Sequence, residues 1–554
     1  MKIEEIALKY SLLNAKQYGK AREDAVIKRV LAEMPEAKKE VKKVVEIVRK
    51  MVEKVNLLSK EEIERKISEL NIQEIKEEKE RKELLPELPD AEQGKVIMRL
   101  APFPSGPLHI GNARMAILND YYVKKYNGKL ILFYDDTIGS EEKPIDKEAY
   151  ELIKDGLDWL GVRYHEILYK SDRLEIYYKY AEELIKMGRA YVCTCSKEEI
   201  RKNRRLGVQC LCRGRSIDEN LSLFKQMLEG KIPEGKAVVR LKTDMKHPNP
   251  AFRDRVLLRI CEREHPRVGK KYRVWPMLEF SWAIDDYLIG TTHILRGKEL
   301  VIEDMMEEYI WNIFGWKKAK FIHYGLLRLK EEGAKLSKSK TRKLIEKGEI
   351  KGWDDPRTWS LQSLRKRGFQ PEAIRNFILK LGLSEADITM PVDILYAENR
   401  KIIDKIANRY FAVLNPVRIK LDYNIRKVVV KYHPDYPERG TREIHVDPSE
   451  IYVEKEDLEK LKGKEAALIG MFTVKLDTIS SFVSMEVKDE VPKIHWVSVP
   501  YVKIKIVMPN GSEKEAIAEE SVKYLKEGEI VQFYRVGFCR LDNKETLTFY
   551  FAHK

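Results

Sequence analysis

The sequence predicts a multidomain protein with an α/β Rossmann-like domain in its middle, a helical domain before it and antiparallel β-barrels after it. Three observations support this fold class. The chain has 554 residues, more than one hydrophobic core usually organises. Strand and helix patterns alternate after residue 96, and short β-rich segments with turn signals follow from about residue 423.

The first part of the chain predicts a helical domain. From residue 27 to about residue 70 apolar residues recur at helical spacing, with lysine and glutamate on the opposite face. The charge-dense stretch 75–94 then carries Pro86 and Pro89, which interrupt helices and mark a linker. We therefore expect a helical domain and linker over residues 1–92. Its pattern does not distinguish packing within the chain from docking to another protein.

A glycine-rich segment follows an apolar strand pattern at residues 96–100. It reads Pro102-Phe103-Pro104-Ser105-Gly106-Pro107-Leu108-His109-Ile110-Gly111-Asn112. Closely spaced glycines let a backbone approach a phosphate or an adenine ring, and the start of a helix offers N–H groups to an anion. A lone histidine is more often a satisfied interior residue, but the position of His109 between Gly106 and Gly111 favours contact with a phosphate.

A second segment far along the chain reads Lys335-Leu336-Ser337-Lys338-Ser339. Its two lysines, separated by small residues, suit a triphosphate whose charge must be neutralised as pyrophosphate leaves. By itself the segment could equally be an ordinary basic surface loop. We expect His109 and Lys338 to stabilise the α-phosphorus as it becomes pentacoordinate, with Lys335 assisting.

Strands and helices alternate after the first motif. The pattern predicts a helix over about 112–126, a strand over Lys129–Tyr134 and a helix over Lys147–Leu160. Such alternation is typical of a parallel sheet, whose ligands bind beyond the carboxyl ends of the strands. Because His109 follows one strand and Asp135 follows the next, we expect both at the same edge. Towards the C-terminus, valine, isoleucine and lysine alternate over residues 501–508. The turn signal Pro509-Asn510-Gly511 follows, so this segment predicts a hairpin.

Four cysteines form two short knuckles, Cys193-Thr194-Cys195 and Cys210-Leu211-Cys212. Four thiolates satisfy tetrahedral Zn²⁺ and leave no position for water, so the predicted site is structural. Disulfides are the alternative, since hyperthermophiles use them even inside the cell. We expect Cys261 and Cys539 to be isolated core residues.

The composition favours a polyanionic partner. Lysine and arginine number 104 against 89 aspartate and glutamate residues, a formal net charge of +15. Clustered cations attract phosphate backbones, although the ion-pair-rich surface of a hyperthermophilic protein is the alternative. We find no run of about 18 uncharged apolar residues. The N-terminus alternates charged and apolar residues, so we expect no signal peptide and a cytoplasmic protein.

The two motifs as a pair resemble the HIGH and KMSKS signatures of class I aminoacyl-tRNA synthetases. With further segments in the family's order, the chain resembles archaeal-type glutamyl-tRNA synthetases from about Lys95 to the C-terminus. These segments are Arg99-Leu100-Ala101-Pro102, Tyr134-Asp135-Asp136-Thr137, Trp275-Pro276, Ile284-Asp285-Asp286, Leu295-Arg296-Gly297-Lys298-Glu299, the stretch 402–410 and Ile494-His495-Trp496-Val497.

The resemblance implies an enzyme that uses ATP with Mg²⁺ and L-glutamate to form a glutamyl-adenylate, and then transfers glutamate to the 3′ end of tRNA-Glu. It implies that Arg99 and Arg296 bind the substrate carboxylates and that Asp135 binds the ammonium. It places ATP against His109, Gly111, Glu299, the backbone at Leu326 and Leu327, Lys335 and Lys338. The expected enzyme is a monomer, and the sequence leaves open whether it also charges tRNA-Gln.

The resemblance also implies the division into domains. A class I catalytic domain is expected over residues 93–345, with an acceptor-stem insertion at about residues 190–280 that carries the four cysteines. A helical stem-contact region over residues 346–420 and anticodon-binding β-barrels over residues 421–554 follow.

Three other functions are weighed against this one. A glutaminyl-tRNA synthetase-like enzyme is opposed by Arg296, which the glutaminyl relatives lack, since a neutral amide would leave its charge unpaired in a dry pocket. A catalytically silent tRNA-binding paralogue has no need of His109, Lys338 and Arg296. An enzyme that glutamylates a modified tRNA nucleotide lacks the long chain that follows residue 400 here.

Several positions depart from the family pattern. Asn112 ends the HIGH-like signature, and its amide can still donate a hydrogen bond. The other departures concern the contacts with the amino acid and with the terminal adenosine: Phe103, Leu278 and Trp282 replace polar pocket residues, Ile138 replaces an aspartate, and Phe133 replaces an arginine.

Overall fold

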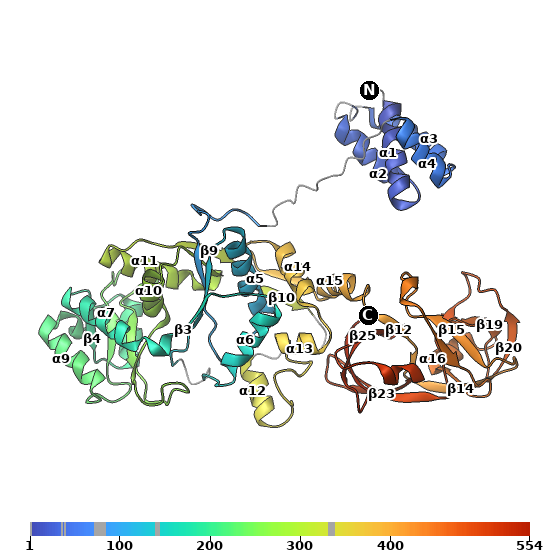
Figure 1. The fold of residues 1–554 in the computed structure, drawn as a ribbon. Coiled ribbons are helices and arrows are strands. Elements are labelled where there is room, and N and C mark those ends of the chain that lie inside the picture. Colours follow the sequence, from blue (N-terminus) through green and yellow to red (C-terminus); the bar gives the residue numbers. More distant parts are fainter. Residues whose placement is uncertain (1–2, 35–36, 38–39, 71–84, 139–143, 331–337) are drawn as a thin grey trace. The chain divides into compact units, whose positions relative to one another are not determined.

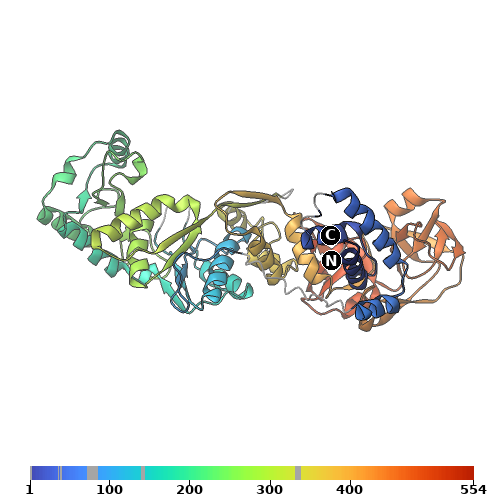
Figure 2. The same cartoon turned by 90° about the horizontal axis from the view of Figure 1, so that it is seen from above.

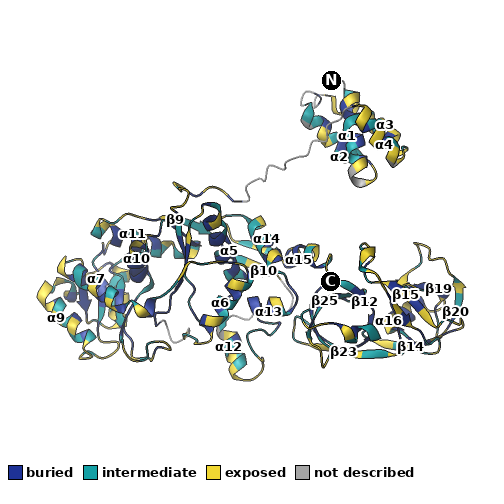
Figure 3. Cartoon of the chain, in the orientation of Figure 1, coloured by how far each residue is buried: buried dark blue, intermediate teal, exposed yellow. Residues whose placement is uncertain are grey.

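The computed structural model describes residues 3–34, 37, 40–70, 85–138, 144–330 and 338–554 (Figure 1). The chain forms two compact units, residues 1–83 and residues 84–554. In both units the buried residues gather on the inner faces of helices and strands (Figure 3). Within the described ranges, no helix combines the length and the apolar character needed to cross a membrane.

The first unit consists of four helices: α1 (Ile3–Tyr18), α2 (Glu23–Glu33), α3 (Val41–Asn56) and α4 (Lys60–Glu69). They enclose their own apolar core, to which α3 contributes Val44, Val48 and Val52. Helix α4 begins with a capping box, because Ser59 Oγ accepts from Glu62 N and the Glu62 carboxylate accepts from Ser59 N. The predicted helical domain is therefore present. Residues 75–84 of the predicted linker lie outside the described ranges, whereas the part that carries Pro86 and Pro89 is described.

The second unit begins with a parallel sheet of order β1-β2-β3, formed by β1 (Ile97–Leu100), β2 (Lys129–Tyr134) and β3 (Glu166–Tyr169). Helix α5 (Ile110–Lys125) joins β1 to β2, and α6 (Ala149–Trp159) joins β2 to β3. Strand β8 (His293–Gly297) pairs in parallel with β9 (Lys320–Tyr324) and lies beside β1, where Thr292 N donates to Ile97 O at 2.9 Å. The strand and helices predicted here are confirmed to within a few residues.

An insertion separates β3 from β8. Its antiparallel sheet has the order β4-β5-β6-β7, with strands at Ala190–Cys193, Val238–Leu241, Val256–Ile260 and Val274–Pro276. Helices α7 (Leu174–Lys186), α8 (Lys197–Leu206) and α9 (Ile217–Leu228) accompany it, and α10 (Leu278–Leu288) and α11 (Val301–Phe314) flank β8 in the chain. The insertion is the green segment of Figures 1 and 2. The insertion shares one apolar core with α10 and α11, and buried Trp275 belongs to this core.

Helices follow the parallel strands. Strand β10 (Leu327–Lys330) pairs in parallel with β11 (Ile388–Pro391). Between these strands in the chain lie α12 (Lys338–Glu346), α13 (Leu361–Lys366) and α14 (Pro371–Leu381), and α15 (Asp393–Ile403) follows β11. Buried Arg367 connects these helices to the last strand, because its Nη2 donates to the carbonyl of Ala552 at 2.9 Å.

Two seven-stranded sheets complete the chain, with the orders β12-β25-β26-β27-β23-β24-β13 and β21-β18-β19-β20-β14-β17-β22, beside a β15-β16 hairpin. The elements are β12 (Asn408–Tyr410), β13 (Ala412–Val413), β14 (Pro416–Leu421), β15 (Lys427–Lys431), β16 (Thr441–His445), β17 (Ile451–Glu454), α16 (Lys455–Leu461), β18 (Glu465–Leu468), β19 (Thr473–Lys475), β20 (Ile479–Ser484), β21 (Lys493–Ile494), β22 (Val497–Ser498), β23 (Tyr501–Val507), β24 (Glu513–Glu519), β25 (Ile530–Phe533), β26 (Gly537–Asn543) and β27 (Thr548–His553).

The strand-rich C-terminal part confirms the predicted fold class. Strands β23 and β24 form the predicted hairpin, whose turn contains Gly511 at φ +83°. The sheets also include parallel pairs, such as β12 with β25, because segments far apart in the chain meet as neighbours.

Candidate active site

His109 caps the start of α5. Its Nδ1 accepts hydrogen bonds from Gly111 N at 3.0 Å and from Asn112 N at 3.3 Å, while Asn112 Oδ1 accepts from His109 N. Because Nδ1 is an acceptor, these hydrogen bonds place the proton of the neutral ring on Nε2. A Cβ at Gly111 would lie 2.9 Å from His109 Cε1, so only glycine leaves the ring in this position. Asn112, which departs from the HIGH signature of the family, therefore forms part of the N-terminal cap of α5.

The two nucleotide motifs meet in the structure. Lys338 is the first residue of α12, and its Nζ donates to the carbonyl oxygen of Gly106 at 3.4 Å. One turn further along, Arg342 Nη2 donates to Ser105 O at 2.8 Å and pairs with Asp146 at 3.2 Å. Lys338 of the predicted cationic segment therefore lies against the predicted phosphate turn, and it begins a helix where a loop was expected. Lys335 lies outside the described residues.

Three charged residues assigned to the amino acid lie on neighbouring strands. Arg99 is on β1, Asp135 directly follows β2, and Arg296 is on β8. All three are buried, and all three already have partners within the protein. The structure therefore brings two guanidinium groups and a carboxylate to neighbouring strands, each beside a group of opposite charge.

Arg99 makes a bidentate pair with Asp286 of α10. Its Nε and Nη2 each lie 2.7 Å from a carboxylate oxygen, and both side chains are buried. A bidentate pair of this kind fixes the guanidinium plane. Asp286 therefore holds Arg99 in one orientation at the end of β1.

Arg296 bridges two acidic side chains of α11. Its Nη1 donates to Glu307 at 2.8 Å and its Nη2 pairs with Asp304, which also contacts His323. Burial raises the pKa of Glu307 to about 8, although Arg296 opposes this shift. Arg296 Nε and Glu307 Oε2 are buried without a hydrogen-bond partner in the described part of the chain. The cluster therefore contains two buried polar atoms, one on the guanidinium and one on the carboxyl group, that are not hydrogen-bonded to described residues.

Asp135 pairs with a lysine that sequence reasoning did not single out. Lys170 follows β3, is fully buried, and places Nζ 3.0 Å from Asp135 Oδ1. Nζ also lies 3.7 Å from the centre of a Trp282 ring, and Arg99 Cζ lies 3.6 Å from it. Phe133 packs edge-on against Trp282 at 5.1 Å. Phe133, Trp282 and Leu278 belong to one apolar cluster, so these departures from the family pattern pack together.

The remaining residues assigned to the ATP site lie close to strands β8 to β11 in the chain. Glu299 is exposed on the short helix η5 (Lys298–Leu300) that follows β8, and a Cβ at Gly297 would overlap its carboxylate. Leu326 N donates to Asp387 at 3.0 Å, and Leu327 pairs with β11. The Leu326 carbonyl also accepts from Ile388 N at 2.8 Å, so both backbone groups of Leu326 already have partners at the start of β11.

Sequence reasoning missed the partners of the charged site residues. Lys170 could have been found by the rule that located Asp135, because it also follows a parallel strand. Arg342 lies four residues after Lys338 and therefore on the same face of α12. Asp304 and Glu307 carry no local signal, since only tertiary packing brings α11 to Arg296.

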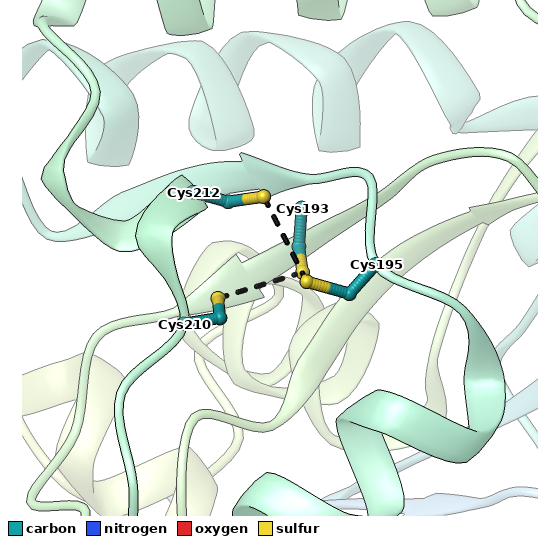
Figure 4. A group of neighbouring side chains, drawn as sticks. All are labelled: Cys193, Cys195, Cys210 and Cys212. Carbon is teal, nitrogen blue, oxygen red and sulfur yellow. Dashed lines mark hydrogen bonds between the residues drawn. The ribbon is translucent and has the colours of Figure 1, made fainter.

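The four knuckle cysteines converge (Figure 4). Cys193 Sγ lies 3.8 Å from Cys210 Sγ, Cys195 Sγ lies 3.9 Å from Cys212 Sγ, and all four sulfur atoms lie within 4.8 Å of one another. Zinc–sulfur bonds of about 2.3 Å in a tetrahedron require sulfur atoms about 3.8 Å apart. The cluster therefore fits a zinc ion. Cys261 and Cys539 are buried in separate apolar cores, as predicted.

A buried arginine lies beside this cluster. Arg240 Nη1 lies 3.7 Å from Cys193 Sγ and 3.8 Å from Cys210 Sγ, and its Nε donates to the Asp254 carbonyl. The hydrogen bond between Cys193 and Cys210 lowers the pKa of the Cys210 thiol and raises that of Cys193, and burial raises the pKa of Cys195. Thiolates are the form that binds metal, and the Arg240 guanidinium is a cation placed to stabilise them.

Comparisons with known proteins identify the family. Residues 95–405 match tRNA synthetases class I (E and Q), catalytic domain, and residues 407–492 and 493–542 match two anti-codon binding domains of the same class. The chain belongs to the class I (E and Q) tRNA synthetase family.

The full-length relatives are glutamate–tRNA ligases. The chain is 47% identical to that of Pyrococcus furiosus and 44% identical to that of Methanocaldococcus jannaschii, with 100% of both chains covered in each case. It is 42% identical to that of Archaeoglobus fulgidus over 98% of both chains. These findings confirm the predicted resemblance to archaeal glutamyl-tRNA synthetases and the prediction of a tRNA synthetase enzyme.

Proposed function

We propose that the chain joins L-glutamate to the 3′ end of tRNA-Glu through a glutamyl-adenylate. The observation that carries this proposal is the contact of Lys338 Nζ with the Gly106 carbonyl, which brings the two nucleotide motifs together at the start of α5. It occurs in a chain whose full-length relatives are glutamate–tRNA ligases.

The proposed first step forms a mixed anhydride. A carboxylate oxygen of glutamate attacks the α-phosphorus of ATP, and the bond to pyrophosphate breaks. His109 Nε2–H donates to a phosphate oxygen, and the Lys338 ammonium offsets the charge that develops on the leaving group, with Lys335 assisting. Both interactions strengthen as the phosphorus becomes pentacoordinate, so they accelerate the step rather than only binding ATP. Mg²⁺ is expected to arrive with ATP.

The second step uses the same edge of the sheet. A hydroxyl of the terminal adenosine attacks the glutamyl carbonyl, and AMP leaves with the phosphate oxygen. Arg99 and Arg296 are proposed to bind the two carboxylates of glutamate and Asp135 its ammonium. Each has a partner within the protein, so glutamate must share or replace these partners. Glu299 and the backbone at Leu326 and Leu327 are proposed to complete the nucleotide site, with Gly111 beneath His109.

The four cysteines are proposed to hold one structural Zn²⁺. A bound zinc ion would cross-link the end of β4 to the turn that carries Cys210 and Cys212. The donor set and the sulfur spacing support this. We keep the predicted roles of the domains: acceptor-stem binding by the insertion, stem contact by the helices after residue 346, and anticodon binding by the C-terminal sheets.

A charging assay tests this function. Purified protein is incubated with ATP, Mg²⁺ and labelled glutamate or glutamine, on transcribed tRNA-Glu and tRNA-Gln. Glutamate on tRNA-Glu is the expected product, and glutamate on tRNA-Gln as well would show a relaxed choice of tRNA. Glutamine as the better substrate would favour the glutaminyl alternative. Binding of tRNA with no charging would favour a silent paralogue. A cytoplasmic monomer remains part of the proposal, and light scattering of the purified protein tests the monomer.

A further inference from the structure

A buried lysine lies where the amino-acid site meets the sheet. Lys170 is the first residue after β3 and has no exposed surface. Removing an ammonium from water is costly unless acceptors and opposite charges surround it. The proposed reaction gives Lys170 no chemical role, so its burial next to Asp135 requires another explanation.

Three groups surround the Lys170 ammonium, which has three N–H donors. Nζ lies 3.0 Å from Asp135 Oδ1, 2.6 Å from Ser281 Oγ and 3.7 Å from the centre of a Trp282 ring. The aromatic face is itself attractive to a cation. A hydrogen-bond acceptor, an opposite charge and an aromatic face thus surround the ammonium, which can serve as an anchor for the carboxylate.

The anchor reaches one oxygen of Asp135. Thr137 Oγ1 lies 3.5 Å from the same Oδ1. No hydrogen bond joins Asp135 Oδ2 to another described residue, and Oδ2 is not among the buried atoms that lack a partner. The Asp135 side chain keeps 10% of its surface exposed whereas Lys170 keeps none. Oδ2 is therefore the oxygen that faces the open side of the site.

We propose that Lys170 is a positioning residue of the amino-acid site, which holds Asp135 so that Oδ2 meets the α-ammonium of the substrate. This inference rests on the proposed function, which assigns Asp135 to that ammonium. Trp282 links the anchor to the other half of the site, because the same side chain contacts the Arg99 guanidinium at 3.6 Å. Trp282, which stands where the family has a polar residue, thereby shields the Lys170–Asp135 and Arg99–Asp286 pairs from water.

The test separates glutamate binding from ATP binding. Lys170→Met removes the ammonium and keeps an unbranched stem. Its KM for glutamate should rise about tenfold or more, because the hydrogen bond that Asp135 makes to the substrate ammonium loses its alignment. Its KM for ATP should stay within about twofold of wild type, since the partners of Lys170 among the described residues all lie outside the nucleotide motifs. Lys170→Gln keeps an N–H donor and should recover part of the affinity for glutamate.

Lys124→Met is the matched control. Lys124 Nζ pairs with the buried Asp120 at 2.7 Å in the last turns of α5, at the opposite end of that helix from His109, so both KM values should stay unchanged. A wild-type KM for glutamate in Lys170→Met would overturn the inference, and Lys170→Gln decides by the same criterion if Lys170→Met does not fold. Equal rises for glutamate and ATP would also overturn it. A wild-type protein that charges no glutamate would overturn the proposed function, and this inference with it.

Discussion

Arg296 is the residue whose replacement separates substrate recognition from stability. In Arg296→Gln the buried Asp304 carboxylate loses its cation, and Glu307, whose pKa burial raises to about 8, loses a hydrogen-bond donor. Leaving a buried charge unpaired costs about 3–5 kcal/mol. If Arg296 also binds a glutamate carboxylate, each lost charge-assisted hydrogen bond weakens substrate binding by about 1.5–3 kcal/mol. The KM for glutamate should then rise about 10- to 150-fold.

Arg255→Gln supplies the matched control. Arg255 also bridges two carboxylates, the buried Glu279 and the partly exposed Glu303, but it lies on the insertion. Both variants should lower the unfolding temperature by several degrees, as a scanning calorimeter measures it. Only Arg296→Gln should raise the KM for glutamate in the charging assay. Equal KM values for the two variants would refute the assignment of Arg296 to the substrate.

Three further predictions concern the metal cluster and the buried acid. Cys210→Ser should lose the zinc that wild-type protein retains on dialysis, measured by atomic absorption; equal zinc in both would contradict the proposed site. Arg240→Gln should weaken zinc binding about 10- to 100-fold in a chelator competition, because a cation supports the thiolates; an unchanged affinity would exclude this role. The raised pKa of Glu307 means that the folded protein holds a proton that the unfolded chain releases between pH 4.5 and about 8. The unfolding temperature should therefore fall as pH rises through this range, and Glu307→Gln should reduce the fall; an equal fall in both proteins would contradict it.

The sequence predicted those parts of the site that local order determines. The glycines and His109 lie in one short segment, and the helix cap they form needs only neighbouring residues. Asp135 was placed correctly at the sheet edge because the residue after a parallel strand lies at the edge where the strand ends. The cysteine knuckles converged as their spacing predicts, since each pair lies on one short turn.

The partners of the charged residues were not predictable in the same way. Asp286 reaches Arg99 from a helix that begins almost 180 residues later in the chain, and no periodic pattern records such a pair. The same holds for Lys170 with Ser281, which belong to different segments of the second unit. The sequence showed Phe133, Leu278 and Trp282 as separate departures, whereas the structure shows that they form one apolar cluster. Mutual packing therefore explains changes that looked independent along the chain.

The formation of glutamyl-adenylate in a single turnover tests the central claim most directly, that the two motifs form one ATP site. Wild-type protein, Lys338→Ala and Lys343→Ala are each mixed with ATP, labelled glutamate and tRNA-Glu. Lys343 is an exposed residue of the same helix and serves as the control. Removing one group that stabilises transition-state charge should slow the step about 10²- to 10³-fold in Lys338→Ala only. A wild-type rate in Lys338→Ala would contradict the claim that Lys338 acts at this ATP site.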